Sequence, residues 1–495
     1  MKNLIELPRI LWSSGDERVE QDCACSTDIS LFSMKAPPEQ DTETDCACAP
    51  VAAPVQVGLP VGELWGISPS LYRVPLTDGY QLAFNPTGPV GAVVLNASAA
   101  RMLDSFAIPT PLTSSATRQL AALGLLTPAH ATEHAARNSP QTLTLWLHLT
   151  TRCNLRCTYC YAPRGNNDMS PEIGKAAVEG ALRSAQAHGF RALKLKYAGG
   201  EPTLNLPTLR AVHKYARARA AQANLELREV VLTNGTTLTP PLLEWLRDED
   251  IRIAISLDGL GAVHDRQRAS TSGGSFTTVV QGIDRALALG VFPHLSITVS
   301  AHNVDHLAEG VAFALDRGLS FNLNFVRLAP GHSDLIPPPE RLMAGLRAVL
   351  DELMRRLKAG VKPVFSFAGL LDRCDFGTPH RYPCAAGHAY LVVGPEGTLA
   401  PCHMEMERIV GTVWEVDPLA ALQREGSFCN PPVEEKVECW ECPWRYACAG
   451  GCPLMAQQYR ATPAAPSLYC AVYREILPQL LRLEGLRILQ SQSTA

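Results

Sequence analysis

The sequence predicts an α/β fold: a partial (β/α)6 barrel, preceded by a small winged-helix-like α+β module and followed by a cysteine-rich segment. Two observations support this prediction. Between about residues 141 and 365, short apolar runs alternate with stretches of helical length, which is typical of a parallel sheet. The 16 cysteines among the 495 residues fall in three groups, with four near the N-terminus, three early in this regular region and nine near the C-terminus.

Residues 1–54 are expected to form a poorly folded tail. They are rich in Asp, Glu, Pro, Ser and Thr and show no sustained apolar periodicity. The tetrapeptide Asp-Cys-Ala-Cys occurs twice, with acidic neighbours, and contributes Cys23, Cys25, Cys46 and Cys48. Three interpretations remain open: inert tail sequence, a metal site built from the two C-x-C pairs, or a segment that mimics or is a cysteine-bearing substrate carried in cis.

Residues 55–135 predict the small α+β module. Its elements are bounded by turn residues such as Asp78-Gly79. Strands are expected at 71–74 and 81–84, and helices at 97–106 and 115–123. Residues 131–140 have the composition of a linker.

The barrel is assigned to residues 141–365. Its strands are expected at 143–149, 192–197, 227–233, 251–257, 292–299 and 320–326. Its helices are expected between these strands, including 171–188, 207–220, 276–289 and 303–317. Six units without an obvious seventh indicate an open barrel. In parallel βα folds the active site forms at the carboxyl ends of the strands, so residues that follow the strands are the candidates for chemistry.

A cysteine triplet follows the first strand, with Cys153, Cys157 and Cys160 in a C-x3-C-x2-C spacing. Three thiolates on one short loop can hold three irons of a [4Fe–4S] cube and leave the fourth iron open to a small molecule. A zinc site is the alternative, but zinc usually takes four ligands in paired C-x2-C units.

This triplet, together with the strand-end motifs over residues 143–330, resembles the radical S-adenosylmethionine (SAM) superfamily. The resemblance implies that the amino and carboxylate groups of SAM bind the open iron. It also implies that the reduced cluster cleaves SAM to methionine and a 5′-deoxyadenosyl radical, which abstracts hydrogen from the substrate. The protein then supplies position and protection from side reactions.

Further SAM-site candidates end the predicted strands. Gly199 and Gly200 would let the backbone approach a ligand closely, and Glu201 can accept a hydrogen bond from the SAM amine. Tight-turn formation, strand capping and ordinary packing are the alternative explanations for these residues. The remaining candidates are Asn234, Ser256, Asp258 and, inside the triplet, Tyr159, which resembles the aromatic residue near the adenine in this superfamily.

The C-terminal cysteines occur in the patterns C-x12-G-x4-C and C-x2-C-x5-C-x3-C, followed by Cys470. The arrangement resembles the SPASM extension of radical SAM enzymes, assigned to residues 366–480, with 481–495 as a C-terminal tail. It implies two auxiliary [4Fe–4S] clusters, hence three clusters in all; zinc ribbons are the alternative. The first auxiliary cluster would be held by Cys384, Cys402, Cys452 and, as nearest candidate, Cys374. The second would be held by Cys439, Cys442, Cys448 and Cys470, leaving Cys429 over.

The resemblance implies an oxidoreductase that acts on a peptide. We expect a ribosomally synthesised peptide substrate that receives a thioether or other crosslink, and an electron donor of the flavodoxin or ferredoxin type. The module at 55–135 resembles PqqD-like peptide-recognition domains, in which a leader peptide adds as a strand to a sheet edge; the alternative is a purely structural cap on the barrel. The alternative is an anaerobic sulfatase-maturating type of enzyme, which oxidises Cys or Ser of a protein to formylglycine. A non-enzymatic electron carrier would leave the SAM-site residues without a role.

The composition also limits which classes of binding partner are expected. The formal net charge is −4, from 44 basic and 48 acidic residues, which predicts neither a nucleic-acid nor an anionic-membrane partner. No apolar run approaches the length of about 20 residues that a membrane span needs. The N-terminus lacks a basic segment followed by an apolar one, so a cytoplasmic protein is expected.

The cysteine pattern predicts the metal content directly. Anaerobically reconstituted protein should bind about twelve irons, from three four-iron cubes. Changing Cys153, Cys157 and Cys160 together to Ala should remove about four irons and abolish SAM cleavage, because the thiolates are the cluster ligands. Iron analysis and chromatography of 5′-deoxyadenosine measure both effects. Stoichiometric zinc with little iron would contradict the assignment.

Overall fold

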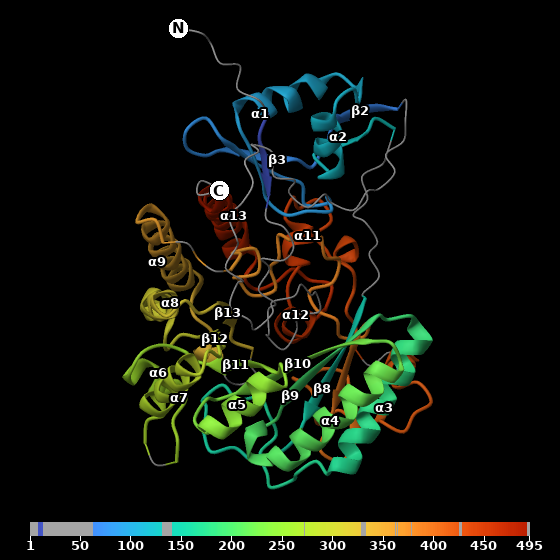
Figure 1. Ribbon diagram of the computed structural model, residues 1–495, viewed down its shortest axis with the longest axis vertical. Coiled ribbons are helices and arrows are strands. Elements are labelled where there is room, and N and C mark those ends of the chain that lie inside the picture. Colours follow the sequence, from blue (N-terminus) through green and yellow to red (C-terminus); the bar gives the residue numbers. More distant parts are fainter. Residues whose placement is uncertain are drawn as a thin grey trace, which may run out of the picture.

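The computed structural model describes residues 8–12, 63–130, 141–271, 273–327, 333–361, 363, 365–377, 379–424 and 428–492. The chain is arranged in three tiers (Figure 1). The N-terminal module lies at one end, the βα barrel at the other, and much of the cysteine-rich C-terminal segment between them. None of the described helices is both long and apolar enough to cross a membrane.

The six predicted barrel strands are confirmed, and neighbours in the order β8 to β13 all pair in parallel. Every residue of β8 and β9 is buried, as expected for strands covered on both faces. The strands are β8 (Thr142–His148), β9 (Ala192–Ala198), β10 (Glu226–Thr233), β11 (Arg252–Ser256), β12 (His294–Val299) and β13 (Phe321–Phe325).

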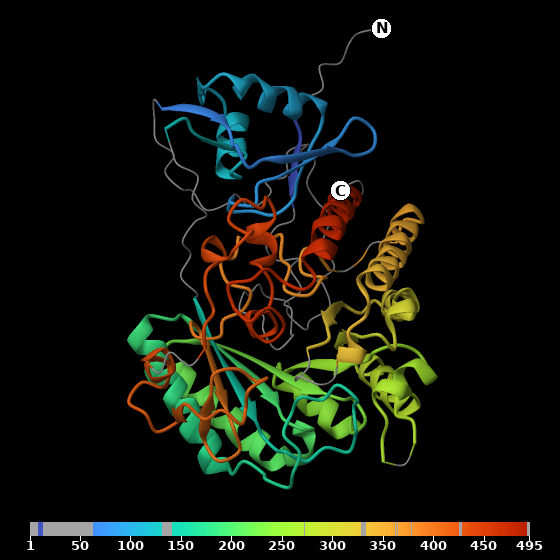
Figure 2. The same cartoon turned by 180° about the vertical axis from the view of Figure 1, so that it is seen from behind.

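The barrel helices lie on the outer side of this sheet (Figures 1 and 2). Helix α3 (Pro171–His188) begins with two residues that favour a helix N-terminus. Ser170 accepts a hydrogen bond from the Ile173 amide, and Pro171 occupies the first helical turn. It ends at Gly189, which is left-handed with φ of 72°. The helices are α3 (Pro171–His188), α4 (Leu206–Gln222), α5 (Pro240–Asp248), α6 (Ala262–Gln267), α7 (Phe276–Ala288), α8 (Leu307–Asp316) and α9 (Pro339–Lys358), with short 3-10 turns at Pro202–Asn205, Val304–His306 and Ser333–Leu335.

The cysteine-rich segment extends the barrel sheet. Strand β14 (Tyr390–Val393) pairs in parallel with β8, and β15 (Thr398–Ala400) and β16 (Gly411–Thr412) continue it antiparallel. The result is one sheet in the order β13-β12-β11-β10-β9-β8-β14-β15-β16. The sequence analysis does not predict this pairing, because β14 and β8 are separated by more than 240 residues, about half the chain.

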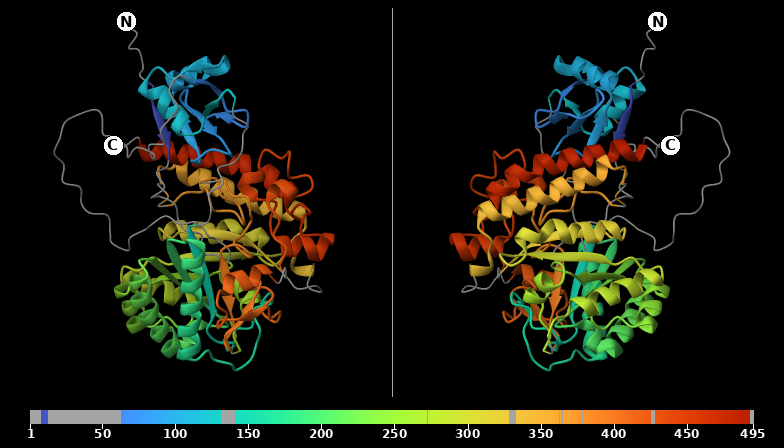
Figure 3. Two further views of the ribbon diagram at one scale, coloured as in Figure 1. Left: turned by 90° about the vertical axis from the view of Figure 1, so that its right-hand side faces the viewer. Right: turned by 90° about the vertical axis from the view of Figure 1, so that its left-hand side faces the viewer.

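The C-terminal residues 481–495 were expected to be a tail, and this expectation is wrong for the described residues. Residues Cys470–Gln492 form one helix, α13, which packs along α9 beneath the N-terminal module (Figure 3). Its Glu484 is 2% exposed and accepts hydrogen bonds from Ser366 Oγ (2.7 Å) and the Phe367 amide (2.8 Å). The helix is buried on several sides, so it lacks the single apolar stripe by which a surface helix is recognised. The segment's remaining helices are α10 (Pro418–Arg424), α11 (Arg445–Cys448) and α12 (Pro453–Arg460), with a 3-10 turn at Val433–Glu435.

The N-terminal module contains the two predicted strands and both predicted helices. A four-stranded sheet has the order β1-β5-β4-β3, and a three-stranded sheet has the order β6-β2-β7. The elements are β1 (Ile10–Trp12), β2 (Leu64–Ile67), β3 (Tyr72–Pro75), β4 (Gln81–Phe84), β5 (Val93–Leu95), α1 (Ala97–Asp104), a 3-10 turn at Ser105–Ala107, β6 (Thr110–Pro111), α2 (Ser115–Ala122) and β7 (Leu126–Pro128).

Strand β1 corrects the prediction that residues 1–54 are uniformly unfolded. Residues 10–12 pair antiparallel with β5 at the edge of the module's sheet. Three residues are too few to show periodicity on their own, and the pairing partner lies more than 80 residues away. The four tail cysteines lie outside the described residues.

The module is joined to the cysteine-rich segment by aromatic packing. The Phe84 ring lies 5.8 Å from that of Phe376 and 6.3 Å from that of Trp444, and Tyr72 contacts Trp444 at 5.2 Å. Phe84 belongs to the main hydrophobic core of the molecule. The module and the cysteine-rich segment therefore share a core.

This packing predicts that Phe84→Ala destabilises the folded chain by about 3–5 kcal/mol, because a buried aromatic ring leaves a cavity that collapses only in part. Thermal or denaturant unfolding measures the loss. Ile108→Ala is the matched control, because Ile108 is 77% exposed. If both variants unfold alike, the interface does not stabilise the molecule.

Candidate active site

The three predicted cysteines converge on one pocket at the carboxyl ends of the barrel strands. Cys153, Cys157 and Cys160 line it, and we call it the three-cysteine pocket. Five further predicted residues line the same pocket: Tyr159, Gly199, Gly200, Asn234 and Ser256. The strand-end rule applied to the sequence therefore located the pocket.

Backbone hydrogen bonds hold the cysteine loop on two sides. The Gly200 amide donates to Thr150 O (2.7 Å) and the Glu201 amide donates to Arg152 O (2.8 Å). On the other side, the amides of Arg156 and Thr158 donate to the carbonyls of residues 269 and 267, at 2.7 and 2.9 Å. The loop is therefore positioned by main chain, which few side-chain substitutions can disturb.

The glycine pair is required by this close approach. A Cβ atom on Gly200 would lie 2.2 Å from Arg152 O, and one on Gly199 would lie 2.6 Å from Thr150 O. Gly199 also has φ of +150°, a conformation that side chains rarely adopt. Both glycines line the pocket. A side chain at either position would collide with the backbone of the cysteine loop.

Glu201 lies behind the pocket. Its carboxylate is fully buried and accepts hydrogen bonds from Thr203 Oγ1 (2.6 Å), Thr233 Oγ1 (2.8 Å) and the Asn234 amide (2.8 Å). Burial raises the pKa of this carboxyl, and the hydrogen bonds act in the opposite direction. In the structure, Glu201 links the end of β9 to the end of β10 through these hydrogen bonds. A direct contact between Glu201 and the SAM amine remains a prediction.

Asn234 connects the end of β10 to the cysteine loop. Its Nδ2 donates to Asn154 Oδ1 (2.8 Å) and lies 3.9 Å from Cys153 Sγ. Its Oδ1 accepts from the Thr236 amide and hydroxyl, which fixes the orientation of the amide group. Asn234 therefore orients Cys153 and also lines the pocket.

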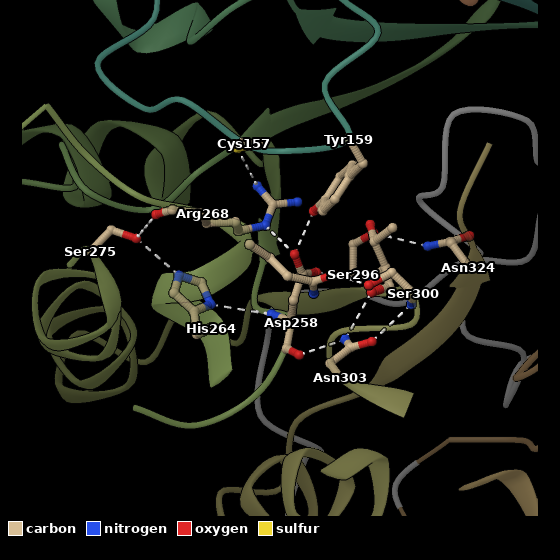
Figure 4. A network of polar contacts seen from close by, with 12 residues as sticks. Cys157, Tyr159, Asp258, His264, Arg268, Ser275, Ser296, Ser300, Asn303 and Asn324 are labelled. Carbon is tan, nitrogen blue, oxygen red and sulfur yellow. Dashed lines mark hydrogen bonds and ion pairs between the residues drawn. The ribbon is translucent and has the colours of Figure 1, made fainter. Parts of the chain in front are cut away.

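Asp258 is the centre of a buried polar network (Figure 4). Its carboxylate accepts from the Tyr159 hydroxyl, from Arg268 Nε (2.6 Å) and from the Thr298 amide (2.8 Å). The Arg268 guanidinium lies 5.3 Å from the Tyr159 ring centroid and 3.8 Å from Cys157 Sγ. Asp258 is 1% exposed, is not among the pocket-lining residues, and holds Tyr159 and Arg268 in place; its predicted contact with SAM remains a prediction.

Several pocket residues were missed in the sequence. Ser296, Thr298 and Asn324 lie on β12 and β13, and Ser296 Oγ accepts from Asn324 Nδ2 at 3.0 Å. Polar residues alternating near the ends of these strands could have been recognised by the rule that found Ser256. Arg268 follows α6 and has no local signal, because only the fold brings it to Asp258.

The far wall of the pocket comes from the cysteine-rich segment. His403 and Met404, which directly follow Cys402, line the three-cysteine pocket. The His403 ring stacks on Trp146 of β8 with centroids 4.9 Å apart, and its Nδ1 lies 3.1 Å from the Tyr390 hydroxyl. Burial lowers the pKa of His403 well below its ordinary value, so the imidazole is neutral at pH 7. The cysteine loop and the Cys402 segment therefore face the same space.

Four C-terminal cysteines gather around a second, smaller pocket. They are the set that the resemblance assigns to one auxiliary cluster: Cys439, Cys442, Cys448 and Cys470. Burial raises the thiol pKa of Cys439 to about 11 and that of Cys448 to about 12. A bound metal ion or cluster would lower these pKa values and hold the cysteines as thiolates.

Two cysteines of the other predicted set, Cys384 and Cys452, lie near Lys436. The Lys436 ammonium donates to the carbonyls of Ala449 (2.9 Å) and Gly451 (3.2 Å). Burial lowers its pKa, while the nearby thiols of both predicted sets act in the opposite direction: Cys439, Cys384, Cys448 and Cys452. Burial raises the pKa of the Cys374 thiol, and the largest charge effect on that pKa comes from Cys448, a member of the other set. The structure therefore favours Cys374 as a neighbour of the second cluster set.

Within the described parts of the chain, no three His, Cys, Asp or Glu side chains lie as close together as the ligands of one metal ion. Thiolate donors suit both zinc and iron–sulfur clusters, so the assignment of these cysteines to clusters remains a prediction.

Known proteins resemble this chain in sequence and fold. Residues 147–310 match the family model of the Radical SAM superfamily. The AdoMet-dependent heme synthase of Methanosarcina barkeri is 27% identical over 352 residues, which cover 66% of this chain and 95% of that protein. A GTP 3',8-cyclase of Listeria monocytogenes is 30% identical over 193 residues, which cover 38% of this chain and 54% of the cyclase.

Among solved structures, native anSMEcpe with bound AdoMet and Cp18Cys peptide has a TM-score of 0.59 and 19% identity to this chain. The likeness covers 70% of this chain and 99% of the other. At this identity the likeness concerns the fold, and it covers more of the chain than residues 147–310.

The Asp258 network predicts a stability effect that needs no bound cofactor. Asp258→Asn leaves the buried Arg268 guanidinium without its carboxylate, which should cost about 3–5 kcal/mol in the free energy of unfolding. Chemical denaturation of the metal-free protein measures this loss. The matched control is Asp305→Asn, which removes the same kind of Arg–Asp pair where both side chains are about half exposed. That pair is screened by solvent, so stability should hardly change; equal losses in the two variants would show that Asp258 has no special role.

Proposed function

The chain contains a radical SAM superfamily domain at residues 147–310, and from this premise we propose that it is a peptide-modifying enzyme. The proposed reaction abstracts hydrogen from a ribosomally synthesised peptide and forms a thioether or other crosslink. When bound, SAM and a [4Fe–4S] cluster supply the hydrogen-abstracting chemistry. An electron donor of the flavodoxin or ferredoxin type would reduce the cluster.

One observation carries this proposal. The three-cysteine pocket is bounded on one side by the loop of Cys153, Cys157 and Cys160 and on the other by the residues that follow Cys402. A substrate in this pocket would lie between the radical-generating site and the auxiliary cysteine segment. This placement suits a reaction in which the radical-generating site removes a hydrogen atom from the substrate and the auxiliary cysteine segment accepts an electron from it.

The chain's own residues prepare the pocket for this reaction. Asn234 orients Cys153, and Arg268 lies beside Cys157, so two of the three thiolates have fixed neighbours. The polar groups of Ser256, Thr298 and Asn324 offer donors and acceptors to a bound molecule. Trp146 and the neutral His403 form an apolar stacked wall, which excludes water from the reacting atoms.

A peptide substrate has two supports. The solved relative anSMEcpe is described with a bound peptide as well as AdoMet, and its fold covers 70% of this chain. The N-terminal module presents a sheet whose edge strands are β1 and β3. Edge strands offer unpaired backbone groups to which an extended peptide can add.

Two alternatives lead to different products. Oxidation of a Cys or Ser to formylglycine would need only the barrel and the auxiliary clusters, and would leave the N-terminal module without a substrate role. The sequence likeness to a heme synthase raises a tetrapyrrole substrate as another outcome. Anaerobic incubation of the full chain with SAM, a reductant and each substrate class, followed by mass spectrometry, separates these cases. Loss of two hydrogens from a peptide that does not react with an aldehyde-specific hydrazide supports the proposal, because oxidation of Ser to formylglycine removes two hydrogens as well; aldehyde formation or porphyrin turnover would overturn it.

The proposal predicts a separation of two activities. Changing Cys439 and Cys442 to Ala should remove about four irons and stop formation of the peptide product, while SAM cleavage continues without coupling, since the barrel cluster remains. Iron analysis, 5′-deoxyadenosine and the mass of the peptide are the readouts.

Cys429→Ala is the control for this experiment, because Cys429 is exposed and outside both predicted sets. It should retain the full iron content and the product. A double variant that still forms the product at the rate of the unmodified enzyme would remove the second auxiliary cluster from the proposed reaction.

A further inference from the structure

Strand β1 joins the larger sheet of the N-terminal module from outside the chain order of that sheet. Strands β3, β4 and β5 follow one another in the chain and pair as an antiparallel meander. Strand β1 (Ile10–Trp12) adds antiparallel to the outer side of β5. The next described strand, β2, begins only at Leu64 and belongs to the other sheet. The meander is therefore complete without β1, which is an added strand.

Without β1, β5 would be an outer strand with no protection against further pairing. The other outer strands of the two described sheets each contain a proline, which cannot donate a hydrogen bond to an added strand. These prolines are Pro75 in β3, Pro111 in β6 and Pro128 in β7. Strand β5 (Val93–Leu95) consists of three aliphatic residues, all fully buried. Among the described strands of the module, the β5 edge is thus the one suited to receive an extended chain.

The side chains of the added strand enter two different cores. Ile10 is 9% exposed and belongs to the module's own core, whereas Leu11 packs against the main core of the molecule. Arg9, one residue earlier, is exposed. Helix α13 contacts both β1 and β5, and Figure 3 shows β1, the darkest blue strand, running from the module toward this helix. The β5 edge therefore selects two adjacent apolar residues and leaves the residue before them unrestricted.

Main-chain hydrogen bonds extend the pairing by one residue. The Arg9 amide donates to Asn96 Oδ1 (2.9 Å), and the Asn96 amide donates to Arg9 O (3.1 Å). The same Oδ1 atom accepts from the Ala99 amide (2.9 Å) and so caps α1. This cap lies within the module and needs no residue of β1. Asn96 thus holds an acceptor in position for the backbone of an added strand, and backbone contacts of this kind supply affinity for extended peptides.

We propose that the β5 edge is a docking site for an extended peptide with two adjacent apolar residues, and that residues 8–12 occupy it in cis as an exchangeable strand that a peptide substrate must displace. The strand is short and pairs with one neighbour, which is typical of segments that open without global unfolding. Its covalent tether gives it an effective concentration on the order of millimolar, so an added peptide must outcompete it. The role as a substrate site rests on the proposed function, but docking is tested without any turnover.

The test uses a fluorescein-labelled synthetic peptide of residues 5–14 and the anaerobically reconstituted full chain, with fluorescence anisotropy as the readout. Ile10→Asp in the full chain places a carboxylate in the core of the module and should expel β1 from the β5 edge. The labelled peptide should then bind roughly tenfold more tightly to this variant than to the unmodified chain, because the tethered competitor has left. The same peptide carrying Ile10→Asp should bind to neither chain.

Arg9→Asp is the matched control, because it introduces the same residue one position away, where the side chain is exposed. It should leave the affinity of the peptide unchanged. Ile10→Ala repeats the test without a buried charge and should give a smaller gain in affinity. Hydrogen exchange locates the site: the β5 amides should exchange faster in the Ile10→Asp variant and become protected again when the peptide binds, while the β3 amides stay unchanged.

Equal affinity of the peptide for the Ile10→Asp and unmodified chains would overturn the inference. So would loss of the cooperative unfolding transition in that variant, because β1 would then be an essential part of the fold. A dimer that exchanges β1 between two copies, detected by light scattering, would overturn occupancy in cis. A peptide that protects the β5 amides but is not modified supports the docking and counts against the proposed function. Modification of a peptide that leaves these amides unprotected supports the proposed function and overturns the docking.

Discussion

Strand β8 is hydrogen-bonded to β9 on one side and to β14 on the other, and the geometry of the site depends on this double pairing. The first pairing places the cysteine loop beside the Gly199-Gly200 turn. The second places β14 beside β8, and β15 then runs back antiparallel to β14, so that His403 stacks on Trp146 within β8. The loops at about residues 150 and 200 therefore meet at the carboxyl ends of parallel strands, and His403 joins them from the face of the sheet. Without β14, the pocket would have no far wall.

Two buried carboxylates stabilise this arrangement, and neither lines the pocket. The Glu201 carboxylate accepts hydrogen bonds from Thr203, Thr233 and the Asn234 amide. The Asp258 carboxylate accepts hydrogen bonds from Tyr159, Arg268 and the Thr298 amide. Each carboxylate receives several hydrogen bonds, which offset the free-energy cost of burial. Tyr159, Arg268 and Asn234 line the pocket and are held in place by the two carboxylates behind it. The pocket surface is therefore preorganised before a ligand binds.

The N-terminal module is packed onto the rest of the molecule. Strand β1 pairs with β5 within the module, and the module shares its core with the cysteine-rich segment through Phe84 and Trp444.

The sequence by itself determined the barrel strands, most of the helices, the cysteine triplet and the strand-end residues Gly199, Asn234 and Ser256. These follow from local periodicity, turn residues and spacing, which act over a few residues and can be recognised in one dimension. The four cysteines that the resemblance groups together also line one small pocket, and their assignment to a cluster stays a prediction.

Only the tertiary structure decided the pairing of β14 with β8, the folding of β1 onto β5, and the burial of α13. It also decided that Arg268 and His403 reach the pocket, and that Glu201 and Asp258 lie behind it. The physical reason is the same in each case. These features depend on contacts between residues far apart in the chain, whose free energy comes from shared burial and hydrogen bonding that no local pattern records.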